Sequence, residues 1–226
     1  MKITVLNTGV FSVNTIIVQI SDKCCFVVDP AGCPLSHDET RIVDFIKSNQ
    51  LECVAIVLTH SHFDHITGIL PLKNAFPTAK VAIHTNEASE LQNPPGPMNL
   101  SVISYFGCIE LLSEVAKQPE ADILLNTGDN LGKIISSEKD LKIHDELKKW
   151  EIILTRGHTP GSICLYNRTD EILISGDTLF DYGSYGRTDM YGGNQSDILQ
   201  SLALLKKIIK PGTVVYPGHD SFGFKF

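Results

Sequence analysis

The chain has 226 residues, of which 42% are hydrophobic and 20% are charged, a composition typical of one large or two small globular domains. Its 19 basic and 26 acidic residues give a formal net charge of −7, which disfavours nucleic acid and anionic membranes as partners. No apolar run has the length of a transmembrane helix, and polar residues interrupt the N-terminal segment too early for a signal peptide. The six cysteines show no zinc-finger or disulfide-framework spacing, which favours buried free thiols and a cytoplasmic location.

The N-terminal half of the chain combines short β-like runs with one clear helical pattern. The first expected strands cover residues 3–6, 15–20 and 24–28. Ser36 and Glu39 have the spacing of a capping box, and apolar residues at helical spacing follow them over 42–48. The next expected strands are the short apolar runs at 53–58 and 81–84.

The C-terminal half repeats this alternation after a less regular stretch. A loop is expected at 93–97 and a helix at 107–117. Further strands are expected at 152–155, 163–166, 172–175 and 213–216, with a helix at 197–209 before the last of them. This order of elements predicts an α/β sandwich with helices on the outside.

Four apolar runs are each followed at once by a short polar loop that contains a His or an Asp. The segments are VAIVL-THSHFDH, EIILT-RGHTPGS, EILIS-GDTLF and TVVY-PGHD. Ligand and catalytic groups collect where strands end in loops, so neighbouring strands would bring these side chains together. The side chains are those of His60, His62, Asp64, His65, His158, Asp177 and His219. Imidazole and carboxylate groups without a thiolate suit zinc, iron or manganese.

The densest of these loops is the segment from Thr59 to His65. His60 and His62 can point the same way from an extended segment, whereas Asp64 and His65 come from the turn that follows. One cation can take the first pair and a second cation the other, which removes the repulsion between packed imidazoles. Asp177 has two carboxylate oxygens and therefore suits a bridge between two cations.

In this order the motifs HSHFDH, GHTPGS, GDTLF and PGHD resemble those of the metallo-β-lactamase superfamily, over nearly the whole chain. The resemblance implies one domain over 1–226, an αββα sandwich with the metals at one edge, and an elaboration at about 94–149. It also implies two metal sites that share Asp177. Their ligands would be His60, His62 and His158 on one metal, and Asp64, His65 and His219 on the other.

The residues at two of these positions also separate the chain from two branches of the superfamily. The β-lactamases proper commonly have a Cys near the Asp177 position, so hydrolysis of antibiotics is not expected. The diiron flavoprotein relatives have an acidic residue where His62 stands, so that branch is not expected either.

The segment GDTLFDYGSYGRTDMYGGN is most similar to the glyoxalase II-like branch. In hydroxyacylglutathione hydrolases this loop carries a basic residue and a Tyr, which hold the glycine carboxylate of glutathione. Arg187 matches the basic position, but Asp189 stands where the Tyr is expected, and the chain ends seven residues after His219 without the usual C-terminal helical domain. We therefore expect a small carboxylate-bearing substrate held by Arg187, with Tyr185 as a further contact. A salt bridge from Arg187 to Asp181 or Asp189 is the alternative.

Together these patterns predict a dinuclear metal-dependent hydrolase of a small ester or thioester, similar to glyoxalase II. Two divalent metal ions, zinc or else iron or manganese, would supply a hydroxide for attack on the carbonyl and stabilise the oxyanion. Asp64 is expected to act as a ligand and to orient the nucleophile or accept its proton. The expected partner is a small molecule, with no nucleic acid and no membrane, and the sequence leaves the oligomeric state open.

Two other functions remain open at this point. The first is a persulfide dioxygenase-like oxidoreductase with one non-haem iron on two His and one Asp, because the GRTD version of the loop also occurs in that group. The second is a metal-binding protein without turnover, which the full set of seven candidate ligands disfavours. The number of metals bound per chain separates the hydrolase from the dioxygenase.

Overall fold

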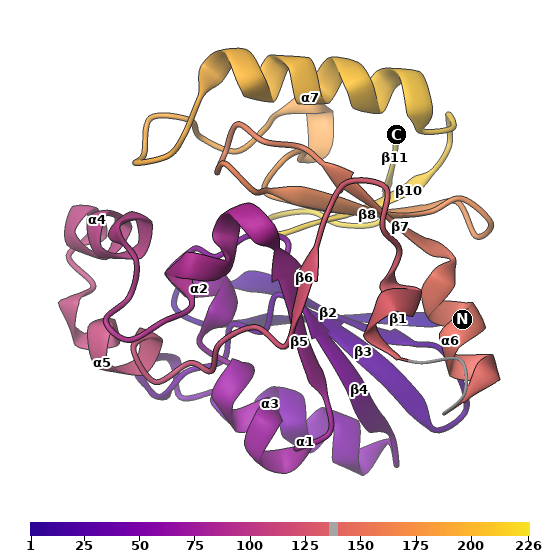
Figure 1. The fold of residues 1–226 in the computed structure, drawn as a ribbon, viewed down its shortest axis with the longest axis horizontal. Helices are drawn as coiled ribbons and strands as arrows, with labels where there is room; N and C mark the ends of the chain where they lie inside the picture. Colours follow the sequence, from indigo (N-terminus) through magenta and orange to yellow (C-terminus); the bar gives the residue numbers. More distant parts are fainter. Residues whose placement is uncertain (136–139) are drawn as a thin grey trace.

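Two β-sheets lie face to face, and helices cover their outer sides (Figure 1). The computed structural model describes residues 1–135 and 140–226. The αββα sandwich expected from the sequence is confirmed.

The first sheet is built from the N-terminal half of the chain. Its strands are β1 (Lys2–Thr8), β2 (Val13–Gln19), β3 (Cys24–Val28), β4 (Glu52–Val57), β5 (Lys80–His84) and β6 (Ile123–Leu125), side by side in that order. The first three are antiparallel, and β3 to β6 are parallel. Parallel strands need long crossovers, and α1 (Arg41–Ser48) and α3 (Ile69–Ala75) provide two of them on the outer face.

The second sheet is built from the C-terminal half. Its strands are β7 (Trp150–Leu154), β8 (Ile163–Asn167), β9 (Ile172–Gly176), β10 (Val214–Pro217) and β11 (Phe224–Lys225), in the order β11-β10-β9-β8-β7. Strands β9 and β10 are parallel, and α7 (Gln195–Ile208) connects them across the outer face. Figure 1 shows α7 above this sheet and α1 and α3 below the other.

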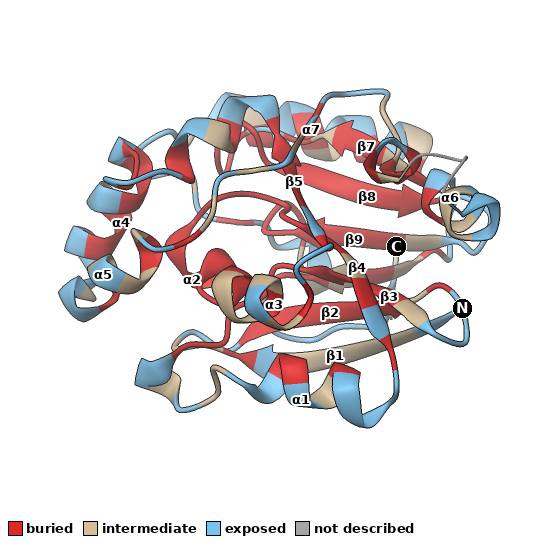
Figure 2. Cartoon of the chain, turned by 60° about the horizontal axis from the view of Figure 1, so that its bottom comes forward, coloured by how far each residue is buried: buried red, intermediate tan, exposed pale blue. Residues whose placement is uncertain are grey.

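Three apolar layers hold the sandwich together, and the central strands β2, β3, β8 and β9 are almost entirely buried (Figure 2). The middle layer lies between the sheets, where the rings of Phe26 and Trp150 pack edge to face with centroids 5.4 Å apart. The other layers lie under α1 and α3, and under α7. Among the described residues, every helix is too short or too polar to cross a bilayer.

Two of the helices expected from the sequence begin or end elsewhere in the structure. The Ser36 hydroxyl bonds Cys33 and Asp38 inside a short 3-10 turn, so it caps no helix, and α1 begins only at Arg41. The helix expected at 107–117 is instead α4 (Pro97–Phe106), which ends at Gly107 with φ +68°, followed by a 3-10 turn and the short α5 (Leu112–Val115). A glycine in the left-handed region ends a helix, so Gly107 is a stop signal and not a start.

The stretch at 94–149, which was expected to be an elaboration, contributes regular structure to the sandwich. It supplies β6 to the first sheet and also contains α6 (Leu141–Lys148), which the sequence analysis did not find. The helices α4 and α5 lie at one end of the molecule, where α4 approaches α2 (Phe63–Ile66) of the histidine-rich loop (Figure 1).

Candidate metal centre

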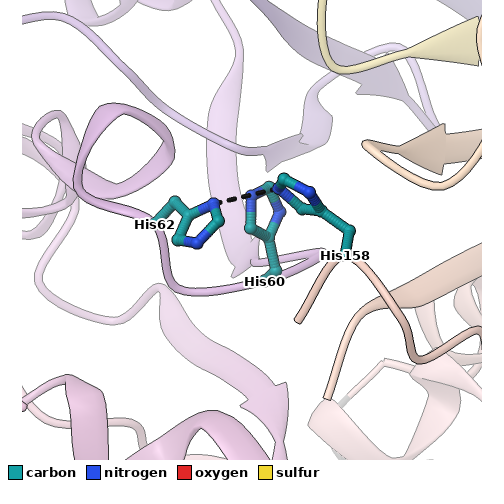
Figure 3. Close-up of side chains that lie close together, drawn as sticks. All are labelled: His60, His62 and His158. Carbon is teal, nitrogen blue, oxygen red and sulfur yellow. Dashed lines mark hydrogen bonds between the residues drawn. The ribbon is translucent and has the colours of Figure 1, made fainter. Parts of the chain in front are cut away.

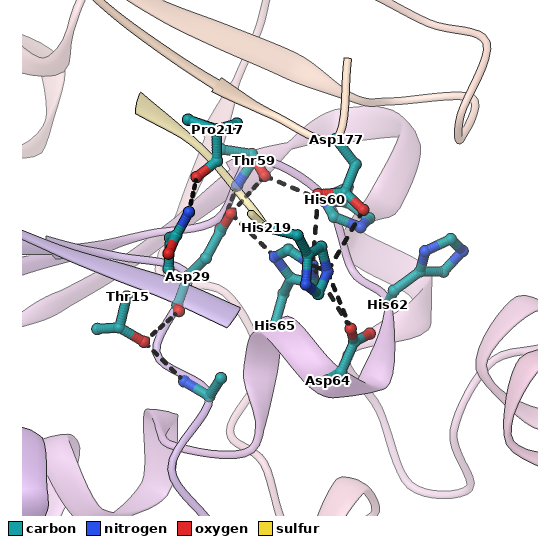
Figure 4. A network of polar contacts seen from close by, with 12 residues as sticks. Thr15, Asp29, Thr59, His60, His62, Asp64, His65, Asp177, Pro217 and His219 are labelled. Atoms are coloured by element: carbon teal, nitrogen blue, oxygen red, sulfur yellow. Dashed lines mark hydrogen bonds and ion pairs between the residues drawn. The ribbon is translucent and has the colours of Figure 1, made fainter. Parts of the chain in front are cut away.

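Seven side chains from four strand ends meet at one edge of the sandwich. His60 and His62 follow β4, and Asp64 and His65 lie in the short helix α2 directly after them. The others follow strands of the second sheet, namely His158 after β7, Asp177 after β9 and His219 after β10. The structure therefore brings together every histidine and aspartate that the sequence analysis selected as a candidate ligand, with His158 drawn in Figure 3 and the others in Figure 4.

Three of these histidines form one group. Nδ1 of His62 lies 3.0 Å from Nε2 of His158, and the His60 ring centroid lies 4.8 and 4.9 Å from the centroids of these two rings (Figure 3). All three side chains are buried. Nε2 of His60 is buried and has no hydrogen-bond partner among the described residues. A buried polar nitrogen left in this way lacks a ligand that it is placed to bind.

Asp64, His65 and His219 form the second group. The Nε2 atoms of His65 and His219 are 3.2 Å apart. Oδ2 of Asp64 lies 3.6 Å from Nε2 of His65 and 3.4 Å from Nε2 of His219. The carboxylate and the two imidazoles therefore face one common point.

Asp177 lies between the two groups. Its Oδ2 is 3.5 Å from Nε2 of His158 in the first group and 3.6 Å from Nε2 of His219 in the second. Its Oδ1 is 3.7 Å from Nε2 of His65, is buried, and has no hydrogen-bond partner among the described residues. Oδ2 of Asp177 thus faces both groups, and Oδ1 faces the second group.

These separations are those of ligands that share a metal ion. Two donors about 2.1 Å from a tetrahedral cation lie about 3.4 Å from each other. The donor pairs that do not include His60 are separated by 3.0 to 3.7 Å, and the donors of His60, His62 and His158 all lie within 4.8 Å of one another. The nitrogen and oxygen donors and the unpartnered nitrogen of His60 fit a divalent cation such as zinc.

Burial and neighbouring charges act differently on the two groups. Burial lowers the pKa of His60 and His62 well below the ordinary value, and the neighbouring histidines lower them further. These imidazoles therefore stay neutral and keep a lone pair. Burial also lowers the pKa of His65, but the carboxylates of Asp64, Asp177 and Asp29 outweigh it and raise the pKa to about 10. The second group thus attracts positive charge, which a proton or a metal ion can supply.

Groups behind the ligands fix the orientation of most of the imidazoles. Nδ1 of His158 donates to the Arg187 carbonyl oxygen at 2.7 Å, and Nδ1 of His219 donates to the Phe11 carbonyl oxygen at 3.2 Å. With Nδ1 occupied in this way, Nε2 is left as the donor atom that faces the centre. Hydrogen bonds of this kind set the tautomer and ring orientation of metal-binding histidines.

Asp29 does the same for His65 and was missed in the sequence analysis. Its Oδ2 lies 3.1 Å from Nδ1 of His65, and it accepts hydrogen bonds from the backbone N–H and the hydroxyl of Thr59 at 2.7 and 2.6 Å (Figure 4). Asp29 also forms a possible ligand cluster with His60 and His65, but its oxygens already accept these bonds. The sequence did hold a signal, because Asp29 directly follows the apolar run of β3, as the selected ligands follow theirs.

Glu87 is a second supporting residue that the sequence analysis missed. It lies on the 3-10 helix Thr85–Glu90 and connects two of the loops that carry candidate ligands. One oxygen accepts hydrogen bonds from the backbone N–H of Ser61 at 3.1 Å and from the Ser61 hydroxyl, between His60 and His62. The other oxygen accepts from the backbone N–H of Gly161 at 2.7 Å, in the loop of His158. Burial raises the pKa of Glu87. No sequence motif marked it, because its partners lie far away in the chain.

The candidate metal-binding side chains border a pocket with a volume of about 360 Å³. Its lining includes His62, Asp64, His158, Asp177 and His219 together with apolar side chains. Arg187 also lines it, but its guanidinium pairs with Asp189, so the structure shows the alternative that the sequence analysis had left open. Tyr185 is not among the described lining residues; its hydroxyl accepts a hydrogen bond from Gln195 at 2.9 Å instead.

Comparison with known proteins agrees with this geometry. The model of the Metallo-beta-lactamase superfamily matches residues 8–219, and the chain belongs to that superfamily. A relative in Bacillus subtilis, named probable metallo-hydrolase YqgX, is 31% identical over 201 residues, which cover 88% of this chain and 82% of the relative. Hydroxyacylglutathione hydrolase GloC of Haemophilus influenzae is 23% identical and covers 98% of this chain and 92% of its own length.

A solved structure shows the same architecture. The crystal structure of the BLEG-1 B3 metallo-beta-lactamase superposes with a TM-score of 0.78 at 27% identity, over 99% of this chain and 94% of that one. With the superfamily and the metallo-hydrolase relative, the site defines a metal-dependent hydrolase.

Proposed function

We propose that this protein is a dinuclear metal-dependent hydrolase of a small ester or thioester. The observation that carries the proposal is the position of Asp177, whose two oxygens lie 3.5 to 3.7 Å from imidazole nitrogens of both groups. A single ion of four to six coordination would leave part of this set unused. We assign His60, His62 and His158 to one cation, Asp64, His65 and His219 to the other, and Asp177 to both.

Bound divalent cations lower the pKa of water and polarise a carbonyl group, which is the chemistry this centre would supply. The protein contributes the position of each group. Asp64 lines the pocket beside the centre, so its carboxylate can orient the attacking water and accept its proton. The leaving thiolate of a thioester needs little help from a general acid, because its conjugate acid is already weak.

The relatives support this class of substrate. GloC carries the name of a hydroxyacylglutathione hydrolase, which acts on a thioester, and YqgX is named a metallo-hydrolase. We propose zinc as the metal, with iron or manganese as alternatives, and a small molecule as the partner, with neither nucleic acid nor a membrane involved. All six cysteines are unpaired in the structure, which supports the cytoplasm as the proposed location.

The test is hydrolysis of small acyl esters and thioesters by metal-loaded protein. We expect turnover that a chelator abolishes and that added zinc, iron or manganese restores. Asp177→Ala should remove turnover and weaken metal binding by about 10–100-fold. His144→Ala is the matched control, because His144 lies on α6 away from the centre and pairs only with Asp145 among its described neighbours.

Two results would overturn the proposal. One is turnover that survives in Asp177→Ala. The other is a protein that hydrolyses none of these substrates but consumes oxygen with one iron per chain, which would identify a dioxygenase of the persulfide type.

A further inference from the structure

We infer that the pocket selects substrates whose non-reacting part is uncharged and apolar, and that Asp189 excludes carboxylates by occupying Arg187. This inference deepens the proposed function and rests on it. It replaces the carboxylate-bearing substrate expected from the sequence.

The pocket above the centre has an apolar wall. Phe11, Val102, Phe106, Phe180 and Met190 line it together with the candidate metal-binding side chains. The rings of Phe11 and Phe106 pack together with centroids 5.0 Å apart, so they form one continuous aromatic surface. A volume of about 360 Å³ accommodates an aromatic ring or a short alkyl chain on either side of the reacting ester or thioester group.

Arg187 is the only lysine or arginine among the described residues that line this pocket. Its Nε donates to Oδ1 of Asp189 at 2.7 Å and its Nη2 to Oδ2 at 2.8 Å. This is the two-pronged geometry by which a guanidinium holds a carboxylate, so the Nε–Nη2 edge of Arg187 is already taken. The charge of the pair is also neutralised within the loop.

Two aromatic side chains of α4 hold the guanidinium in this position. Nη2 of Arg187 also donates to the Tyr105 hydroxyl at 3.2 Å, and Cζ lies 4.9 Å from the Tyr105 ring centroid and 5.7 Å from that of Phe106. A planar guanidinium stacked on aromatic rings presents a flat and largely apolar surface. Arg187 therefore extends the aromatic wall instead of offering a free positive charge.

The acidic residues around the pocket act in the same direction. Asp220 lines it next to His219, and the described lining residues include no lysine and no second arginine that would offset its charge. An incoming carboxylate would have to displace Asp189 from Arg187 and also approach Asp220. An uncharged group meets neither obstacle.

A structural role for the pair is the competing explanation. The Arg187 carbonyl accepts the hydrogen bond from Nδ1 of His158, so the pair with Asp189 also braces the turn that orients a candidate ligand. Removal of the Asp189 charge distinguishes the structural role from the role in substrate selection. If the pair only supports the turn, its loss lowers metal affinity and the activity on every substrate. If Asp189 occupies Arg187, its removal changes only the preference between charged and uncharged substrates.

The experiment compares two acetyl thioesters that differ in one group, those of 4-mercaptobenzoate and of 4-mercaptobenzamide. In the metal-loaded wild type we expect the amide to have at least about tenfold higher kcat/KM. In Asp189→Asn the ratio should shift about tenfold toward the carboxylate, mainly through KM, because the contact forms equally in ground and transition states. The double variant Arg187→Gln/Asp189→Asn is the matched control and should show no such shift, because it loses the same acidic charge without releasing a guanidinium.

A second readout does not depend on turnover. NMR titrations with benzoate and benzamide should show a benzoate dissociation constant that falls about tenfold in Asp189→Asn and stays unchanged in the double variant. If neither thioester is hydrolysed but benzoate binding follows this pattern, the proposed function fails and the role of Asp189 stands. A wild type that prefers the carboxylate would overturn the inference. So would an Asp189→Asn variant that loses activity equally on both thioesters and binds metal more weakly.

Discussion

Asp29 lies directly behind His65, with its Oδ2 3.1 Å from Nδ1 of the imidazole, and both side chains are buried. The same carboxylate accepts two hydrogen bonds from Thr59, the residue before His60. One buried group thus orients a candidate ligand of the second group and anchors the loop that carries candidate ligands of the first. The contact connects β3, which carries no proposed ligand, with both halves of the centre.

Replacing Asp29 should therefore weaken metal binding although Asp29 itself is not a proposed ligand. Asp29→Asn keeps the size of the side chain but places an amide where two acceptor oxygens are needed. We expect about 10–100-fold lower metal affinity, the usual effect of losing a hydrogen bond behind a metal ligand. Metal titration measures this, and an affinity equal to that of the wild type would show that His65 is oriented by other contacts.

Glu87 offers a sharper comparison, because Glu90 is a matched control on the same 3-10 helix. Both glutamates are buried and both accept backbone hydrogen bonds, but Glu90 bonds Met98 and Asn99 at the start of α4 instead of the ligand loops. Each change to Gln should cost about 1–3 kcal/mol of unfolding free energy, because a buried N–H donor loses its acceptor.

Only Glu87→Gln should also weaken metal binding, because Glu87 joins the loops of His60, His62 and His158 through Ser61 and Gly161. Denaturant unfolding and metal titration on both variants measure the two effects. Equal losses of metal affinity in both variants would mean that the effect follows from general destabilisation.

Gly218 has no room for a side chain. A Cβ there would overlap Oδ1 of Asp177 and come within 2.8 Å of Cε1 of His65. Gly218→Ala should therefore displace Asp177, remove most activity and lower metal affinity. Gly212→Ala is the control, because Gly212 precedes β10, which Gly218 follows, and its Cβ would meet no described atom within 4 Å. An alanine at its positive φ should lower the free energy of unfolding by only about 1–2 kcal/mol. Comparable metal loss in both variants would contradict the role assigned to Gly218.

Metal removal should destabilise the fold. Without a cation, buried imidazoles and the carboxylates of Asp64 and Asp177 face one another at 3.4 to 3.7 Å. A metal present at about 100 times its Kd adds about 2.7 kcal/mol, which corresponds to a Tm increase of about 5–10 °C for a domain of this size. Calorimetry with and without chelator measures the difference, and an unchanged Tm would mean that the centre binds metal weakly or not at all.

Most of the strands were predicted from the sequence, and the predicted candidate ligands lie together in the structure, for one physical reason. Strands buried on both faces are continuous apolar runs, and the candidate metal ligands follow them directly, so both appear as local patterns. The end of α4 at Gly107 was misread, because the apolar residues on both sides of this glycine give similar helical spacing.

The supporting residues could not be found in the same way. Glu87 reaches Gly161 across 74 positions of the chain, so no local spacing connects them. The pairing of Arg187 with Asp189 was recognised as an alternative from their closeness in sequence. The stacking of Arg187 on Tyr105, 82 positions away, became visible only in the folded chain.

The number of metal ions per chain tests the central claim most directly. Elemental analysis of the fully loaded protein, together with anomalous scattering from crystals, gives both the count and the positions. We predict two ions about 3.5–4 Å apart, with Asp177 in contact with both. A protein that saturates at one ion per chain, with Asp64, His65 and His219 unengaged, would contradict the account.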